Sequence, residues 1–143
     1  MRLTPPPGKS YHVAMEIDDM LALLGRLFIA IIFLASAFGK ITNYEGTLQF
    51  MDAHGMPLID VFCIVAIIIE SLGSVAMILG YKTRWGAASL AIFLVAATGI
   101  FHTAPDQRVQ LLKNLAILGG LLNVISFGPG NISLEGAAKR EHC

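Results

Sequence analysis

The chain has 143 residues, of which 55% are hydrophobic and only 14% are charged, and its ten basic and ten acidic residues cancel. Its mean hydropathy of +0.69 is typical of a membrane protein, and its length accommodates one domain. A neutral chain without a basic block lacks the electrostatic footprint of a nucleic-acid-binding protein, so we expect no nucleic-acid partner.

Four apolar segments follow one another, each long enough, at about 17 to 23 residues, to cross a bilayer. They are Leu21–Ile41, Ile59–Tyr81, Trp85–His102 and Leu111–Phe127. A helix satisfies its backbone hydrogen bonds internally, as a lipid environment requires. The predicted fold is therefore all-α, an integral membrane four-helix bundle that occupies residues 21–127 and has the lipid bilayer as its surroundings.

A short interfacial helix is predicted in the connection between the first two spans, residues 43–57. Tyr44, Leu48 and Met51 recur there at i, i+4 and i+7, so they share one helical face. A glycine and Pro57 then end the helix.

Polar segments flank the bundle at residues 1–20 and 128–143. Four spans place both of these segments on one side of the membrane. Basic residues are more numerous on that side, with Arg2, Lys9, Lys82, Arg84, Lys139 and Arg140 against Lys40, Arg108 and Lys113. The positive-inside rule therefore predicts that both termini are cytoplasmic.

Small residues predict which helix faces pack together, because they let backbones approach closely in lipid. The predicted face of the first span is Gly25, Ile29, Ile32, Ser36 and Gly39. The predicted face of the second span is Cys63, Ile67, Glu70, Ser74, Met77 and Tyr81.

The second span carries a carboxylate, Glu70, near its middle. A charge at membrane depth costs between roughly 2.5 and well over 10 kcal/mol, so it normally has a partner. Helical rise makes Arg26 on the first span the best-placed long cation, with His102 and Lys113 as rivals toward the other end. Two interpretations stay open. Arg26 and Glu70 only neutralise each other and set the register of the two helices, or they face a cavity that a ligand enters.

Lys40, His102 and Lys113 are predicted to lie at one depth on three different spans. Each has an ordinary interpretation, since lysines near helix ends extend to the interface and a histidine there is commonly only hydrogen-bonded. Together they favour the mouth of a polar cavity. The catalytic candidates are Glu70 and His102, and the cofactor-binding candidates are Arg26, Lys40, Lys113 and Asn114. Two cysteines and four scattered histidines offer no ligand set, so we expect no metal.

Eight short motifs occur in order along the chain. They are Gly25-Arg26, Phe38–Lys40, Thr47–Pro57, Glu70–Ser74, Leu79–Trp85, Phe101-His102, Lys113–Leu122 and Gly128–Glu135. Together they resemble the DoxX family of small four-span bacterial membrane proteins over nearly all of residues 24–135. The chain departs from the family after His102, where family members often carry aromatic residues and this chain has Thr103-Ala104-Pro105.

The resemblance implies a redox-linked, multi-pass protein of the bacterial inner membrane. The family is named for a subunit associated with a thiosulfate:quinone oxidoreductase, and relatives look like membrane partners of oxidative-stress and thiol-handling enzymes. It thus implies an accessory or quinone-interacting subunit, with quinone as cofactor and a partner oxidoreductase or a second copy as protein partner. The alternatives are a structural or assembly subunit without a ligand and, less favoured because no inverted repeat is evident, a small-molecule or lipid transporter.

Overall fold

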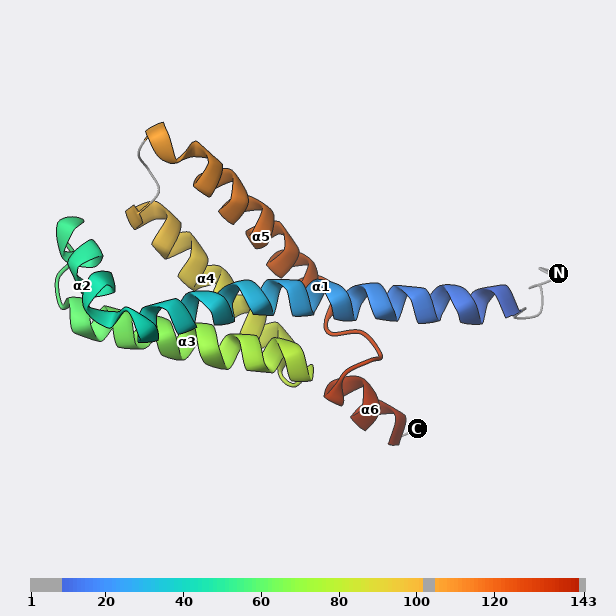
Figure 1. Ribbon diagram of the computed structural model, residues 1–143. Helices are drawn as coiled ribbons and strands as arrows, with labels where there is room; N and C mark the ends of the chain where they lie inside the picture. The colour runs from blue at the N-terminus through green and yellow to red at the C-terminus, as the bar shows by residue number, and fades with distance from the viewer. Residues whose placement is uncertain (1–8, 102–104, 142–143) are drawn as a thin grey trace.

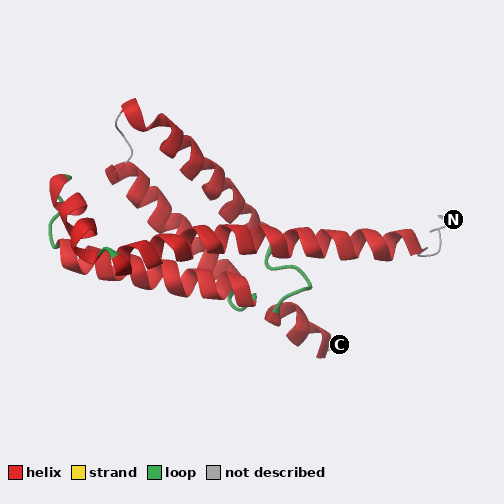
Figure 2. Ribbon diagram, in the orientation of Figure 1, coloured by secondary structure: helices red, strands yellow, loops and turns green. Residues whose placement is uncertain are grey.

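The computed structural model describes residues 9–101 and 105–141, and every regular element in these ranges is a helix (Figure 2). Four helices are long and apolar enough to cross a membrane. They are α1 (Lys9–Thr42), α3 (Ile59–Leu79), α4 (Thr83–Phe101) and α5 (Arg108–Phe127). The predicted all-α class with four membrane-spanning helices is confirmed.

Three shorter elements connect or follow the spans: α2 (Tyr44–Ala53), the 3-10 helix η1 (Pro105–Gln107) and α6 (Leu134–Glu141). The short helix predicted between the first two spans is α2. It stops before Gly55, whose φ of 68° lies in the left-handed region that favours glycine.

The first helix is longer than predicted, because α1 already begins at Lys9. No proline or glycine interrupts the chain between Lys9 and Leu24, so nothing in this stretch breaks a helix. The polar lead-in is therefore helical from Lys9 onward, and Figure 1 shows this part of α1 extending beyond the other spans.

The helix α3 packs against both α1 and α4, and α4 packs in turn against α5. Glycines allow α3 and α4 to approach closely. A Cβ added at Gly73 would lie 2.7 Å from Leu90 Cγ, and one added at Gly86 would lie 2.8 Å from Ala76 Cβ. This is the small-residue packing that lipid favours.

The hydrophobic core lies where these helices meet. Its buried members are Ala30, Phe33, Met77, Ala87, Leu90, Ala91, Leu94, Ile117 and Leu121. The face predicted for the second span is largely correct, since Cys63, Glu70, Ser74 and Met77 are buried. The face predicted for the first span is only partly correct. Ile29 packs against the core and Ser36 contacts Glu70, but Gly25 and Gly39 are exposed, and the buried residues of α1 are Arg26, Ala30, Phe33 and Ala37. Small residues mark where the backbone of a neighbouring helix can approach. In α1, however, the long cations Arg26 and Lys40 point inward and donate hydrogen bonds to polar groups of the bundle.

The first and last spans meet near one end and separate toward the other. A Cβ at Gly120 of α5 would lie 2.8 Å from Ile29 Cδ1 of α1, so the two helices are close there. Toward Arg108 the ribbon of α5 diverges from α1 (Figure 1). The space between α1, α3, α4 and α5 at this end is occupied in part by side chains and in part by the cavity described below.

The turn after α3 requires glycine, and Gly80→Ala is expected to destabilise the fold strongly. Gly80 has a φ of 67°, and an added Cβ would meet Ser133 and lie 2.6 Å from Arg26 Nη1. Gly55→Ala is the matched control, because its φ is 68° but its Cβ would meet nothing within 4 Å. We expect thermal unfolding to show about 1–2 kcal/mol lost for Gly55→Ala and clearly more for Gly80→Ala. Equal losses of stability in Gly55→Ala and Gly80→Ala would contradict a role for the close contacts at Gly80.

Candidate functional site

Glu70 on α3 is bound by two side chains of α1, Lys40 and Ser36. Lys40 Nζ lies 3.0 Å from Oε1 and 2.9 Å from Oε2 of the carboxylate. Ser36 Oγ donates to Oε1 at 3.0 Å, and Lys40 Nζ also donates to Ser36 Oγ at 2.7 Å. The three groups thus form a closed polar cluster, which we call the Glu70 cluster, inside an apolar helix interface.

The local geometry of α1 explains why Lys40 reaches this carboxylate. Lys40 lies one turn beyond Ser36, and side chains on a helix lean back toward its N-terminus. The long alkyl stem of Lys40 can therefore run back along α1 and present Nζ to Glu70. Lys40 retains 17% exposure of its side chain, whereas Glu70 retains 3%.

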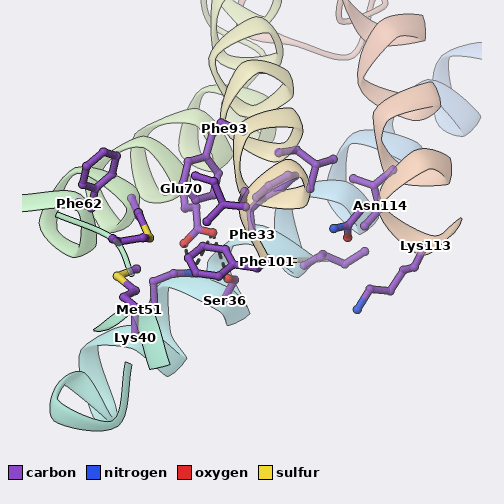
Figure 3. A pocket seen from close by; sticks show the side chains of 18 residues that line it. Phe33, Ser36, Lys40, Met51, Phe62, Glu70, Phe93, Phe101, Lys113 and Asn114 are labelled. Atoms are coloured by element: carbon purple, nitrogen blue, oxygen red, sulfur yellow. Dashed lines mark hydrogen bonds and ion pairs between the residues drawn. The ribbon is translucent and has the colours of Figure 1, made fainter. Parts of the chain in front are cut away.

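The Glu70 cluster forms part of the wall of a cavity of about 420 Å³ (Figure 3). This volume falls within the range of small-molecule binding sites. Most of the other lining groups are apolar. They are Ile32, Phe33, Met51, Met56, Phe62, Ala66, Phe93, Leu94, Ala96, Ala97, Ile100, Phe101 and Ile117.

The short helix α2 contributes to one side of this cavity. Met51 of α2 is 5% exposed and lines the cavity together with Met56. The ring of Phe101 at the end of α4 lies 5.3 Å from that of Phe50 and 5.2 Å from that of His54, between centroids. These ring contacts hold α2 against the end of α4.

Lys113 and Asn114 line the cavity from α5, on the side away from Lys40 in Figure 3. Asn114 is 9% exposed and donates to Thr98 Oγ1 at 2.9 Å, whereas Lys113 is exposed. Neither residue hydrogen-bonds to Glu70. The structure therefore brings Glu70, Lys40, Lys113 and Asn114 to one cavity, but at two separate polar positions.

The predicted pairing of Arg26 with Glu70 is wrong. Arg26 is 1% exposed and donates to Met77 O at 3.1 Å and to Ile132 O at 2.6 Å. It precedes Ser36 by ten residues, about 15 Å along the helix axis, so it is too far from Glu70 to reach the carboxylate. Arg26 does not line the cavity; it joins α1 to the end of α3 and to the C-terminal segment.

Two residues remain: His102, which is a predicted site residue, and Ser36, which is not. His102 lies outside the described residues, so its position relative to the cavity stays a prediction. Ser36 lies within the cluster but was not predicted as a site residue. Its spacing of four residues before Lys40 places both on one helical face, and that spacing was the available signal.

The Glu70 cluster can interact with a further polar group. A carboxylate and an ammonium group in a poorly solvated wall stabilise one another. The three N–H groups of Lys40 are donated to Glu70 and Ser36, whereas the carboxylate oxygens can accept a further hydrogen bond. In the described residues no three His, Cys, Asp or Glu side chains lie close enough to hold a metal ion. The cavity thus offers hydrogen-bond donors, one proton acceptor and apolar contacts.

Comparisons with known proteins agree with the sequence motifs. A family model described as DoxX matches residues 21–103. The chain is 34% identical over 123 residues to "Inner membrane protein YqjF" of Escherichia coli (strain K12), covering 84% of this chain and 93% of that protein. It is 28% identical over 124 residues to "Inner membrane protein YphA" of the same organism, covering 81% and 89%. It is also 35% identical over 75 residues to "Putative oxidoreductase CatD" of Bacillus subtilis (strain 168), covering 52% and 54%.

No solved structure matches the chain. The family model nevertheless covers more than half of the chain, and the similarity to YqjF extends over most of both proteins. Four apolar helices and relatives named as inner membrane proteins identify a multi-pass protein of the bacterial inner-membrane type. The resemblance predicted from the motifs is confirmed, and this chain belongs to the DoxX family.

Proposed function

We propose that the cavity binds the head of a membrane quinone and that the chain works as a quinone-interacting subunit with a partner oxidoreductase. The observation that carries this proposal is the Glu70 cluster in the wall of an otherwise largely apolar cavity. If the ion pair served only to set helix register, it would not explain the adjoining cavity of about 420 Å³.

The residues present fit the chemistry of a quinone. A quinone head is a flat ring with two carbonyl oxygens, so it needs apolar contacts on its faces and hydrogen-bond donors at its ends. Phe33, Phe93 and Phe101 line the cavity and supply apolar contacts. Lys113 Nζ is a donor at one polar position. At the other, Lys40 Nζ donates to a ligand in exchange for one of its three bonds to Glu70 and Ser36.

The polar side chains can bind, orient and exchange protons with such a ligand. When bound, a quinone supplies the redox chemistry, taking up two electrons from the partner oxidoreductase and two protons. Lys40 can exchange one of its bonds to Glu70 or Ser36 for a bond to a carbonyl oxygen. The Glu70 carboxylate, which Lys40 and Ser36 keep oriented, can accept a proton and pass it on. Phenylalanine and methionine side chains limit the access of water to these groups.

The name of one relative, an oxidoreductase, supports a redox role, and the positive-inside rule supports both termini facing the cytoplasm. In this proposal electrons come from the partner oxidoreductase, which makes this chain an accessory subunit.

Glu70→Gln tests the proposal because it keeps the shape of the side chain and removes its negative charge. The chain, purified from native membranes, is expected to retain quinone, and Glu70→Gln is expected to lower its affinity for a decyl-tailed quinone analogue at least tenfold. This loss corresponds to about one charge-assisted hydrogen bond, the one from Lys40, whose ammonium group is oriented by the Glu70 carboxylate. Glu45→Gln, on the exposed face of α2, is the matched control and should bind normally.

The structural alternative gives a different result in the same experiment. If the cluster only assembles helices, Glu70→Gln lowers thermal stability or recovery of a complex, while the folded fraction binds the quinone analogue as the wild type does. Absence of quinone in wild-type protein purified from native membranes, together with unchanged binding by the variant, would exclude the quinone proposal.

A further inference from the structure

The opposite end of the bundle contains a second pocket, of about 350 Å³. It lies where α4 begins and α5 ends, and residues of the C-terminal segment complete its wall. This position distinguishes it from the Glu70 cavity, whose lining includes Phe101 and Lys113 at the other ends of the same two helices. Polar contributors to the wall are Arg84, Asn131, Glu135 and Lys139.

Two cations in this pocket, Arg84 and Lys139, have no carboxylate partner in the described part of the chain, where the ion pair found is Lys40–Glu70. Arg84 Nη2 makes a long hydrogen bond of 3.4 Å to Ser126 O. Glu135 also lines the pocket, where its Oε1 accepts the backbone N–H of Thr83 at 2.9 Å, so its single negative charge offsets only one of the two cations. The pocket therefore presents positive charge that is available to an anion.

The backbone of the C-terminal segment forms a wall of the pocket and is held in place by contacts with α1 and α4. Gly128 and Gly130 have φ of 79° and 78°, and a Cβ at Gly128 would lie 3.4 Å from Arg84 Nε. Glycine thus lets the loop lie against the guanidinium group. Asn131 anchors the loop to α1, because its backbone and side-chain N–H groups each donate at 3.0 Å to the carboxylate of Asp19.

The depth of the pocket matches the level of lipid headgroups. Trp85 is 79% exposed and Phe127 is 83% exposed, and they lie at the ends of the membrane-spanning helices α4 and α5. Aromatic side chains at such ends mark the boundary between headgroups and acyl chains. Cations beside them lie where lipid phosphates are concentrated.

We propose that this pocket binds a phosphate group and that the group belongs to the head of a glycerophospholipid. Arg84 and Lys139 bind the phosphate oxygens, while Phe127 and the neighbouring Trp85 contact the start of the acyl chains. Free phosphate has the same anionic chemistry but gains no contact with these rings. The inference does not depend on quinone binding at the Glu70 cavity.

Native mass spectrometry of delipidated protein in detergent tests the site with three probes: phosphatidylglycerol, diacylglycerol with the same chains, and inorganic phosphate. Phosphatidylglycerol is expected to bind, diacylglycerol to bind poorly, and phosphate alone to bind much more weakly than the lipid. Arg84→Gln and Lys139→Gln should each weaken phosphatidylglycerol binding about tenfold or more, the loss of one charge-assisted contact. Lys82→Gln removes an exposed cation beside the pocket without removing a lining residue, and should change binding less than twofold.

Arg84→Lys keeps the charge and is expected to restore most of the affinity, and circular dichroism checks that each variant is folded. Phosphate binding as strong as lipid binding, lost in the same two variants, would identify the same site but overturn the lipid as its occupant. Equal binding of diacylglycerol and phosphatidylglycerol, or equal losses in Arg84→Gln and Lys82→Gln, would overturn the site.

Discussion

Lys40→Met is expected to lower the free energy of unfolding by about 3–5 kcal/mol, because it leaves the Glu70 carboxylate buried without its cation. Lys40 Nζ contacts both carboxylate oxygens, at 3.0 and 2.9 Å, and Glu70 retains only 3% side-chain exposure. The remaining bond from Ser36 does not neutralise the charge. Unfolding of detergent-solubilised protein by heat or denaturant measures the loss.

The reverse variant, Glu70→Met, is expected to cost less than Lys40→Met. Lys40 retains 17% exposure, so without Glu70 its flexible stem can move Nζ toward water. The double variant Lys40→Met/Glu70→Met should be close to wild type in stability, since replacing both members of a buried pair by apolar groups is often neutral. Lys113→Met, which removes an exposed lysine from the same cavity, is the control and should change stability by less than about 0.5 kcal/mol. A loss in Lys40→Met no larger than in Lys113→Met would contradict the importance of the pair.

Arg26→Met is expected to lower stability by about 2–4 kcal/mol and to release the C-terminal segment from the bundle. Met77 O lies in the last turn of α3, where carbonyl groups lack partners within the helix, and Arg26 donates to it at 3.1 Å. The same guanidinium group donates to Ile132 O at 2.6 Å. Hydrogen bonds from charged donors contribute about 1.5–3 kcal/mol each, and a cation also interacts favourably with a helix C-terminus.

Limited proteolysis and hydrogen exchange distinguish this effect from general destabilisation. Residues 128–141 should become susceptible to cleavage in Arg26→Met under conditions where the spans stay protected. Arg26→Lys should recover only part of the stability, because one ammonium group cannot reproduce the planar fork that serves two carbonyls. Arg108→Met, at an exposed cation on α5, is the control. An intact C-terminal segment in Arg26→Met would show that other contacts hold it.

Two cations of α1, the buried Arg26 and the partly exposed Lys40, perform different tasks. Lys40 neutralises a carboxylate beside a cavity. Arg26 instead serves carbonyl groups at the other end of the bundle. A substitution at Lys40 therefore tests the cavity, whereas a substitution at Arg26 tests the attachment of the C-terminal segment. The two sites are also far enough apart along α1 for their effects on stability to be nearly additive.

Hydropathy by itself determined the four spans and the all-α class, because these follow from segment length and apolar content, which act locally along the chain. The family followed from the eight ordered motifs. The period of Tyr44, Leu48 and Met51 likewise predicted α2, because a helical face repeats every three to four residues. The start of α1 at Lys9 was missed because a polar stretch does not end a helix unless it contains a breaker.

The partner of Glu70 was decided only by the tertiary structure. Sequence and helical rise left Arg26, His102 and Lys113 as candidates, and the guanidinium group favoured Arg26. The rotation and register of α1 against α3 instead place Lys40 and Ser36 beside Glu70, and Arg26 beside Met77. A carboxylate inside an apolar segment needs a cation, and the sequence shows this carboxylate directly. Which cation reaches it depends on how α1 and α3 pack against each other. The sequence by itself thus determined that Glu70 needs a partner, and the packing of α1 on α3 determined that Lys40 provides it.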